Sequence, residues 1–409
     1  MNRRNQLNVM LWLLLALALP LTSALAGGGD AGVRVADSWE IGRMWSGCPL
    51  GAKLLTTRGR QYIAYYDAER QVTVPSRRLG SDDWRTVKLP IHGNWDSHLG
   101  FAMAVDDDGL VHLSGNMHGD PLVYFRTAEP FDIRTFEPIH EMVGRQEDSV
   151  TYEDFFRGPN GRLIFWYRIG GSGDGARIFN VWDPEEKSWS RLLDAPLFDG
   201  LGKMNAYPLG PQEGPQGNYH MVWMWRDTPD AETNHHISYV WTPDMEQWKT
   251  AGGRTLDLPI TPKTEGVVVD PVPPREGLVN MGFSLGFDGQ QRPIVSYHKY
   301  DEDGNNQIYN ARWEGDDWHI YRTSDWDYRW EFGGRGSIPC EVRAGSVRPR
   351  SDGALCQPYS HAKHGGGRWK LDPDTLQPIG TCSGSNFRIP ARVRRLQSDF
   401  PNMQIHLAG

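Results

Sequence analysis

The sequence contains few cysteines, little bulk hydrophobicity and no long apolar run beyond its N-terminal segment, 1–26. Of its 409 residues, 4 are cysteine and 39% are hydrophobic, and the mean hydropathy is −0.56. A multi-span membrane protein needs several runs of about 20 apolar residues, so this composition excludes one. The 46 glycines and 28 prolines exclude a coiled coil or helical bundle, because both residue types interrupt helices.

Aromatic residues are abundant and give the chain ample material for a core. The sequence has 17 Trp, 15 Tyr and 14 Phe, which excludes a disordered protein. Together with the many glycines and prolines, they favour a loop-rich, all-β globular protein. The net charge of −8 makes the protein a poor partner for nucleic acid. An acidic ligand would therefore have to be bound by local arginines.

The N-terminal segment, 1–26, has the features of a cleaved signal peptide. Arg3 and Arg4 are followed by an apolar stretch over 9–21 and by the small-residue site at 24–26. The apolar stretch is short for a membrane span and contains Pro20, although a retained anchor is the alternative. We therefore expect an exported protein, periplasmic or extracellular, in which residues 27–409 form the functional domain.

The four cysteines allow three disulfide pairings, and the sequence does not choose among them. They are Cys48, Cys340, Cys356 and Cys382. A second interpretation joins Cys340 and Cys356 with His361 and His364 as a loose set of zinc ligands. That set lacks the tight Cys-x-x-Cys spacing of most structural zinc sites.

A repeated unit of about 50 residues organises the chain. In each copy a turn containing glycine leads into a strand of alternating polarity, and the glycines at 59, 109, 161 and 217 recur at nearly this spacing. Further copies, more widely spaced, begin at Gly289 and Gly353. A polar turn followed by tryptophan closes most copies, at Trp84, Trp189, Trp248, Trp318 and Trp369. This pattern predicts one β-propeller of seven blades, each of four antiparallel strands, with six or eight blades as alternatives.

Two pairs of polar residues flank predicted hairpins. One hairpin lies between His98 and His118, and because it returns the chain near its origin, their imidazoles could converge. His112 lies within a predicted strand and is expected to be structural. Tyr152 and Arg168 flank the next predicted hairpin in the same way. For each of these residues the alternative is a structural role, such as a salt bridge for the arginine.

Arg168 is followed by a glycine-rich loop over 170–175. The loop lacks the Lys-Ser/Thr of a P-loop, so nucleotide binding is not expected. Its glycines would instead let the backbone approach a bulky substrate, with the guanidinium binding a carboxylate. Other predicted strand ends and loops carry further candidate residues. These are Tyr207, Arg226, His235, His298 and Lys299.

Several segments together resemble the BNR-repeat-containing propeller polysaccharide lyases, which include ulvan lyases and L-rhamnose-α-1,4-D-glucuronate lyases. The resemblance extends over about 45–371 and is carried by GRQYIAYYDAERQVTV, the His98–His118 pair, TYEDFF with WYRIGGSGDG, MNAYP, WMWRDTP with NHHISY, and RPIVSYHKYDEDGNNQIYNAR. It implies a lyase that removes the C5 proton of a uronic acid and expels the group on O4. Such chemistry needs a base, an acid and positive charge or donors at the carboxylate.

The resemblance also implies roles for individual residues. It assigns His98, His118, Tyr152 and Tyr207 to catalysis and places Arg168 and Arg226 on the carboxylate side. We expect His118 to be the base, because its polar loop keeps the imidazole accessible. His235, His298 and Lys299 are expected to contact substrate.

The expected partner is an acidic polysaccharide or oligosaccharide that contains glucuronate and rhamnose, from ulvan or an arabinogalactan-type gum. No nucleic-acid partner, no membrane span and no cofactor for the chemistry are expected, although a structural calcium or zinc ion is plausible by analogy. One alternative is an α-L-rhamnosidase on the same scaffold, which would be expected to carry a histidine in the first blade near 45–48, where none stands. The other is a non-catalytic carbohydrate-binding propeller.

Overall fold

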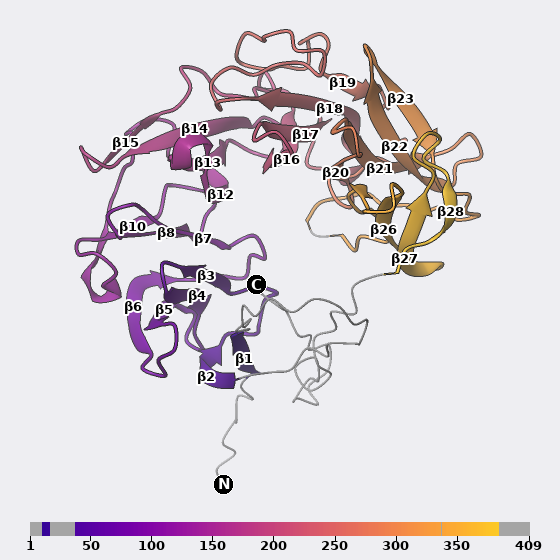
Figure 1. Ribbon diagram of the computed structural model, residues 1–409. Coiled ribbons are helices and arrows are strands. Elements are labelled where there is room, and N and C mark those ends of the chain that lie inside the picture. Colours follow the sequence, from indigo (N-terminus) through magenta and orange to yellow (C-terminus); the bar gives the residue numbers. More distant parts are fainter. Residues whose placement is uncertain (1–9, 17–36, 337, 384–409) are drawn as a thin grey trace. The chain divides into compact units, whose positions relative to one another are not determined.

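The computed structural model describes residues 10–16, 37–336 and 338–383. They group into two compact units, which we describe separately. Unit 1 contains 10–16, 37–156 and 183–188 of the described residues, and unit 2 contains 157–182, 189–336 and 338–383. In both, the regular secondary structure is almost entirely antiparallel strands (Figure 1). The all-β prediction is therefore confirmed.

Unit 1 begins with a strand pair and continues with sheets whose strands follow sequence order. The pair is β1 (Met10–Ala16) and β2 (Asp37–Met44). The next sheet is β3 (Lys53–Thr57), β4 (Arg60–Tyr66), β5 (Gln71–Arg78) and β6 (Arg85–His92). It is followed by β7 (Phe101–Val105), β8 (Val111–Gly115), β10 (Tyr124–Thr127) and β11 (Phe136–Pro138), with a 3-10 turn at Ile133–Thr135. Finally, β9 (His118–Asp120) pairs with β12 (Val150–Arg157).

Unit 2 repeats the same plan. Its first strands, which follow a 3-10 turn at Pro159–Gly161, are β13 (Leu163–Ile169), β14 (Ala176–Asp183) and β15 (Ser188–Arg191). A four-stranded sheet follows, made of β16 (Asn205–Glu213), β17 (Tyr219–Arg226), β18 (Asn234–Thr242) and β19 (Val268–Asp270), with a 3-10 turn at Ala231–Thr233. The next comprises β20 (Ser284–Phe287), β21 (Pro293–Tyr300), β22 (Asn306–Glu314) and β23 (Asp317–Arg322). The last comprises β24 (Val342–Ala344), β25 (Arg348–Pro349), β26 (Leu355–His361), β27 (Gly365–Leu371) and β28 (Pro378–Thr381).

The predicted glycine turns join neighbouring strands of these sheets. Gly109 lies between β7 and β8 with φ +88°, and Gly217 lies between β16 and β17 with φ +74°. These are left-handed conformations that favour glycine. Consecutive four-stranded antiparallel sheets are the building blocks of propeller-like folds. Over the described ranges, five sheets of four or five strands lie within one unit or the other.

Each unit has its own apolar core. In unit 1 the cluster includes Tyr62, Tyr66 and Val111, and in unit 2 it includes Val222, Tyr239 and Tyr297. Burying side chains of this size contributes about 1.5–3 kcal/mol each, so these clusters dominate the stability of the sheets. Trp189 and Trp248, two of the tryptophans predicted to close repeats, are buried as core residues.

The structure decides the cysteine pairing that the sequence left open. Cys356 on β26 and Cys382 after β28 form a disulfide, with a Cα–Cα distance of 6.2 Å. Cys48 and Cys340 are free thiols. The disulfide takes Cys356 out of the possible zinc-ligand set, because its sulfur is already bonded.

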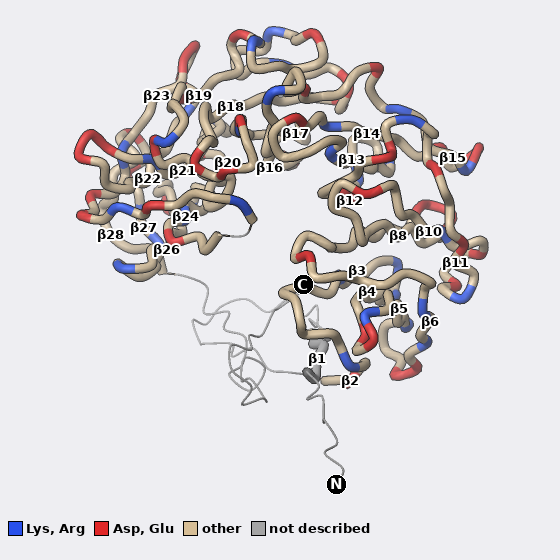
Figure 2. The backbone as a smooth tube through the Cα atoms, turned by 180° about the vertical axis from the view of Figure 1, so that it is seen from behind, with Lys and Arg blue, Asp and Glu red and all other residues tan. Residues whose placement is uncertain are grey.

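The predicted signal peptide lies mostly outside the described residues. Its segment Met10–Ala16 forms β1, which pairs with β2. No helix of the described chain has both the length and the apolar character needed to cross a membrane. Basic and acidic residues are interspersed along the described chain (Figure 2).

Candidate active site

Two imidazoles of unit 1 stack on each other. His98 lies just before β7, and His118 begins β9, so the β7–β8 hairpin returns the chain to its starting edge. The two ring centroids are 4.1 Å apart, with an angle of 25° between the planes. The predicted convergence of His98 and His118 is therefore confirmed.

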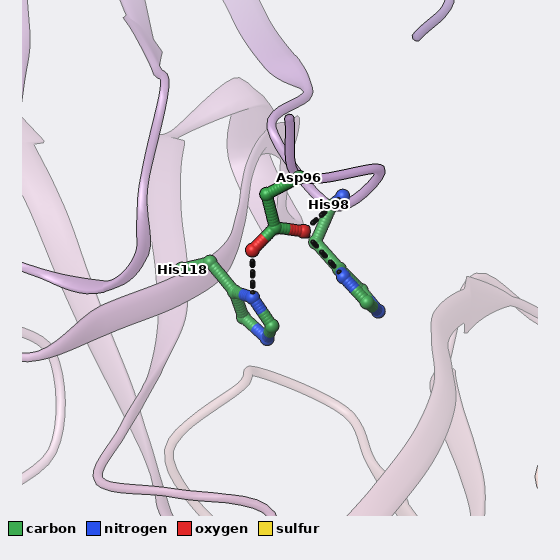
Figure 3. Close-up of side chains that lie close together, drawn as sticks. All are labelled: Asp96, His98 and His118. Carbon is green, nitrogen blue, oxygen red and sulfur yellow. Dashed lines mark hydrogen bonds and ion pairs between the residues drawn. The ribbon is translucent and has the colours of Figure 1, made fainter. Parts of the chain in front are cut away.

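A carboxylate that sequence reasoning missed holds both rings (Figure 3). Asp96 Oδ1 lies 2.8 Å from His98 Nδ1, and Asp96 Oδ2 lies 2.5 Å from His118 Nδ1. The backbone N–H of His98 also donates to Oδ1, at 2.9 Å. In the sequence, only the close spacing of Asp96 and His98 could have indicated this role of Asp96, because its other partner, His118, is 22 positions away.

The Asp96 carboxylate fixes the tautomers of both imidazoles. Burial by itself raises the pKa of Asp96, but hydrogen bonds from His118 and His98 outweigh it and lower the pKa to about 2. The group is therefore ionised near neutral pH and can only accept hydrogen bonds. Each Nδ1 must carry the proton that it donates to Asp96. The lone pair of each neutral ring is then on Nε2, and Figure 3 shows both Nε2 atoms on the side away from Asp96.

Tyr152 completes this group, which we call the His-pair site (Asp96, His98, His118 and Tyr152). The pairing of β12 with β9 sets Thr151 opposite His118, and Thr151 Oγ1 accepts from Gly119 N at 2.8 Å. The ring centroid of Tyr152 is 6.0 Å from that of His98 and 6.4 Å from that of His118. Tyr152 has a φ of +55° and is 37% exposed. A bulky residue in this conformation is uncommon and is often found at functional sites.

The same side chains also offer a possible metal site. One ligand atom each from Asp96, His98 and His118 lies within 4.8 Å of the others. Imidazoles whose other nitrogen donates to a carboxylate are typical of metal ligands as well as of catalytic bases. Because both Nδ1 atoms donate to Asp96, the rings suit either a base or a metal ligand at Nε2, with Asp96 orienting the imidazoles in both cases.

Unit 2 brings Arg168 and Arg226 close to one side chain, Asn205. A Cβ at Gly175 would come within 2.3 Å of Asn205 Oδ1 and 2.9 Å of Arg168 Cδ, so only glycine fits there. Asn205 on β16 lies opposite Arg226 on β17. The glycine-rich loop thus packs against Arg168, and the predicted approach of a substrate to this loop stays a prediction. Arg168 is only 3% exposed.

The Arg226 guanidinium holds a loop in place. Its Nε donates to the carbonyls of Thr228 at 3.1 Å and Asp230 at 3.2 Å, and its Nη2 donates to the carbonyl of Pro229. The guanidinium also lies 5.2 Å from the ring centroid of Tyr207, which is itself buried. These contacts give Arg226 a structural role in addition to any role with substrate.

The other predicted contact residues are engaged within unit 2. His235 Nε2 lies 3.0 Å from Asp227 Oδ1, and its Nδ1 lies 2.7 Å from His236 Nδ1. Lys299 Nζ forms an ion pair with Asp270 at 2.6 Å. Both side chains therefore have internal partners, and substrate contact at either position remains a prediction.

His298 occupies the position of a core histidine. It is 2% exposed and packs against Trp330, with 5.5 Å between the ring centroids. Burial lowers the pKa of His298 to about 4, so the ring is neutral near pH 7. Both ring nitrogens of His298 are enclosed, so neither can bind a polysaccharide, and we do not carry His298 into the proposed site. His112, expected to be structural, is fully buried, with Nδ1 2.7 Å from Tyr124 Oη.

Comparisons with known proteins find one matching family and a set of similar sequences and structures. Residues 60–326 match the model of the BNR repeat-containing family. The short isoform of ulvan lyase from Alteromonas sp. (strain LOR) is 24% identical over 144 residues, which cover 32% of this chain and 27% of that protein. The long isoform from the same strain is 26% identical over 131 residues, covering 30% of this chain and 13% of the relative. The matched segments are thus a small part of these relatives.

Two solved structures share the fold over most of their length. The crystal structure of polysaccharide lyase Uly1 has a TM-score of 0.58 at 14% identity and covers 91% of this chain and 90% of its own. A PL25 ulvan lyase bound to -[GlcA(1-4)Rha3S]- has a TM-score of 0.53 at 14% identity, with coverages of 80% and 81%. At such low identity, the likeness establishes the fold.

Proposed function

The chain belongs to the BNR repeat-containing family, and from this starting point we propose that it is a polysaccharide lyase acting by β-elimination. The observation that carries the proposal is the His-pair site, in which one carboxylate orients two imidazoles next to Tyr152. The names of the ulvan lyase relatives and the -[GlcA(1-4)Rha3S]- ligand of the PL25 ulvan lyase structure support a uronate-containing polymer as substrate. We propose the L-rhamnose-α-1,4-D-glucuronate linkage, in ulvan or an arabinogalactan-type gum.

The proposed reaction begins with proton transfer from C5 of the uronate to Nε2 of His118. This atom carries the lone pair, because Nδ1 donates to Asp96. The C5–H electrons form the C4–C5 double bond while the C4–O4 bond breaks. The departing oxygen takes a proton from the Tyr152 hydroxyl, and His98, held by the same carboxylate, orients the sugar. As His118 becomes an imidazolium, Asp96 stabilises its charge.

The family resemblance assigns two arginines to the uronate carboxylate, Arg168 and Arg226. Positive charge at that group would stabilise the negative charge that develops next to C5 as the proton leaves. Variants at each arginine test this assignment independently of the His-pair site.

The chemistry uses side chains alone, and a structural calcium or zinc ion is an expectation of the resemblance, not a requirement of the reaction. We also propose a signal peptide over 1–26 and a single seven-bladed propeller over 27–409.

Product analysis tests the proposed function. The protein is incubated with ulvan and with a rhamnose-capped gum, and products are followed by ultraviolet absorbance and mass spectrometry. A lyase yields a conjugated, absorbing unsaturated uronate without uptake of water. Free rhamnose without that absorbance would establish a hydrolase, and no product from either polymer would favour a binding protein. His118→Ala should abolish the absorbing product, and His140, an exposed histidine of unit 1, offers a matched control as His140→Ala.

A further inference from the structure

A pocket of about 170 Å³ lies in unit 2, at the strand ends that carry the β16–β17 and β20–β21 turns. His220 lines it near the start of β17, whereas Arg226 ends the same strand. Six residues of extended chain separate these two positions, roughly 20 Å. The pocket is therefore distinct from the Arg168–Asn205–Arg226 group at the opposite strand ends.

Aromatic side chains form the walls of this turn pocket. Trp241 and Tyr239 line it from β18, and Phe287 lines it from the end of β20. Trp241 is half-buried, and its Nε1 donates to the carbonyl of Thr250 at 2.9 Å, which fixes the plane of the indole. A fixed, partly exposed indole offers an apolar face to the C–H groups of a sugar ring.

The polar atoms of the pocket are hydrogen-bonding groups without charge. Gln216 and Gln291, both exposed at the mouth, are joined by a 2.8 Å bond from Nε2 of Gln216 to Oε1 of Gln291. Oε1 of Gln216 can then accept a hydrogen bond from a ligand, and Nε2 of Gln291 can donate one to it. No Asp, Glu, Lys or Arg is among the described residues that line the pocket.

His220 supplies a further polar atom at depth. It is 7% exposed, and its Nδ1 lies 2.6 Å from Tyr239 Oη. Its Nε2 lies on the side of Gly214, where an added Cβ would come within 2.3 Å of it. Burial lowers the pKa of His220 to about 4, which keeps the ring uncharged near pH 7.

We propose that the turn pocket is a second, non-catalytic carbohydrate site that binds an uncharged pyranose residue. Fixed aromatic faces with amide and imidazole groups match the alternating C–H and hydroxyl surface of a sugar. A uronate or sulfated sugar is disfavoured, because no described residue that lines the pocket is cationic; the Lys249 ammonium lies 5.3 Å from the Trp241 ring centroid but does not line the pocket. The pocket would hold a neutral unit of a polymer away from the site of cleavage.

Saturation-transfer NMR and calorimetric titration test the proposal, with L-rhamnose, D-xylose and D-glucuronate as probes. The protein should bind at least one neutral sugar and bind glucuronate more weakly. Gln216→Ala should weaken that binding about 3–10-fold, the equivalent of one lost hydrogen bond. Gln290→Ala is the matched control, since Gln290 is exposed in the neighbouring turn but does not line the pocket. Trp241→Leu, which retains bulk without a ring, should weaken binding more than Gln216→Ala.

Two results would overturn the proposal. One is a neutral-sugar signal unchanged by both Gln216→Ala and Trp241→Leu in variants that keep the wild-type melting temperature. The other is binding of glucuronate as tight as that of the neutral sugars. Repeating the titration in His118→Ala separates this site from the proposed lyase function, because binding in the turn pocket should persist there. Absence of lyase activity in the wild type would therefore leave the pocket result intact.

Discussion

Asp96 Oδ2 lies 2.5 Å from Nδ1 of His118, a residue 22 positions further along the chain. The other oxygen of the same carboxylate contacts His98. One side chain thus sets the tautomer and the orientation of both imidazoles. This arrangement makes Asp96 a positioning residue whose removal should affect both rings at once.

Asp96→Asn should lower kcat of the proposed elimination by roughly 100-fold or more, with a smaller effect on KM. The amide would offer its NH₂ to one imidazole and so favour the wrong tautomer. Initial rates of ultraviolet-absorbing product measure kcat, and nitrogen chemical shifts of the imidazoles report the tautomers. Asp108→Asn, at an exposed turn residue, is the control. Unchanged tautomers and rate in Asp96→Asn would refute the positioning role.

Tyr152→Phe should lower kcat by about 100- to 10,000-fold, because it removes the proposed proton donor and keeps the ring. The ring stays next to His98, so KM should change little. Steady-state kinetics on the same polymer separate kcat from KM. A leaving group of low basicity needs no proton. The Tyr152→Phe variant should therefore lose less of its rate on a substrate that carries such a leaving group. Equal loss on both substrates would argue against the acid role of Tyr152.

Glu153→Gln should stabilise the protein increasingly as pH rises. Burial raises the pKa of Glu153 to about 8, above its ordinary value of 4.5. The folded state therefore binds this proton more tightly than the unfolded state, and the resulting stability is present at low pH and lost between about 4.5 and 8. Above pH 8 the variant should exceed the wild type by roughly 1 kcal/mol or more, since the glutamine stays neutral.

Thermal unfolding at pH 5 and at pH 8.5 measures this effect. Glu129→Gln, at an exposed position in unit 1, provides the control. Its melting temperature should equal that of the wild type at both pH values. A Glu153→Gln variant whose melting temperature tracks the wild type at both pH values would show that Glu153 titrates normally.

Reduction of the Cys356–Cys382 disulfide should lower the free energy of unfolding by about 3 kcal/mol, because the bond closes a loop with a sequence separation of 26. Thiol titration of the denatured, unreduced protein should find two reactive groups, from Cys48 and Cys340. Cys340→Ser is the matched control and should leave the response to reductant intact. Four reactive thiols before reduction would contradict the pairing.

The sequence by itself determined the features that depend on neighbours along the chain. Glycine turns and alternating polarity specified the hairpins, and a hairpin sufficed to predict that His98 and His118 meet. Period-2 patterns report which face of a strand is buried, and turn residues report where the chain reverses. These are local properties, encoded within a few residues.

Only the tertiary structure decided which polar groups pair. Lys299 meets Asp270 from another sheet, Cys356 pairs with Cys382, and His298 is enclosed by packing against Trp330. A strand-end histidine or lysine looks the same in sequence whether it faces solvent or a buried partner. Its environment is set by how strands distant along the chain pack together, because burial and hydrogen bonding act through space. For the same reason, the sequence indicated the two imidazoles but not the carboxylate, Asp96, that orients them.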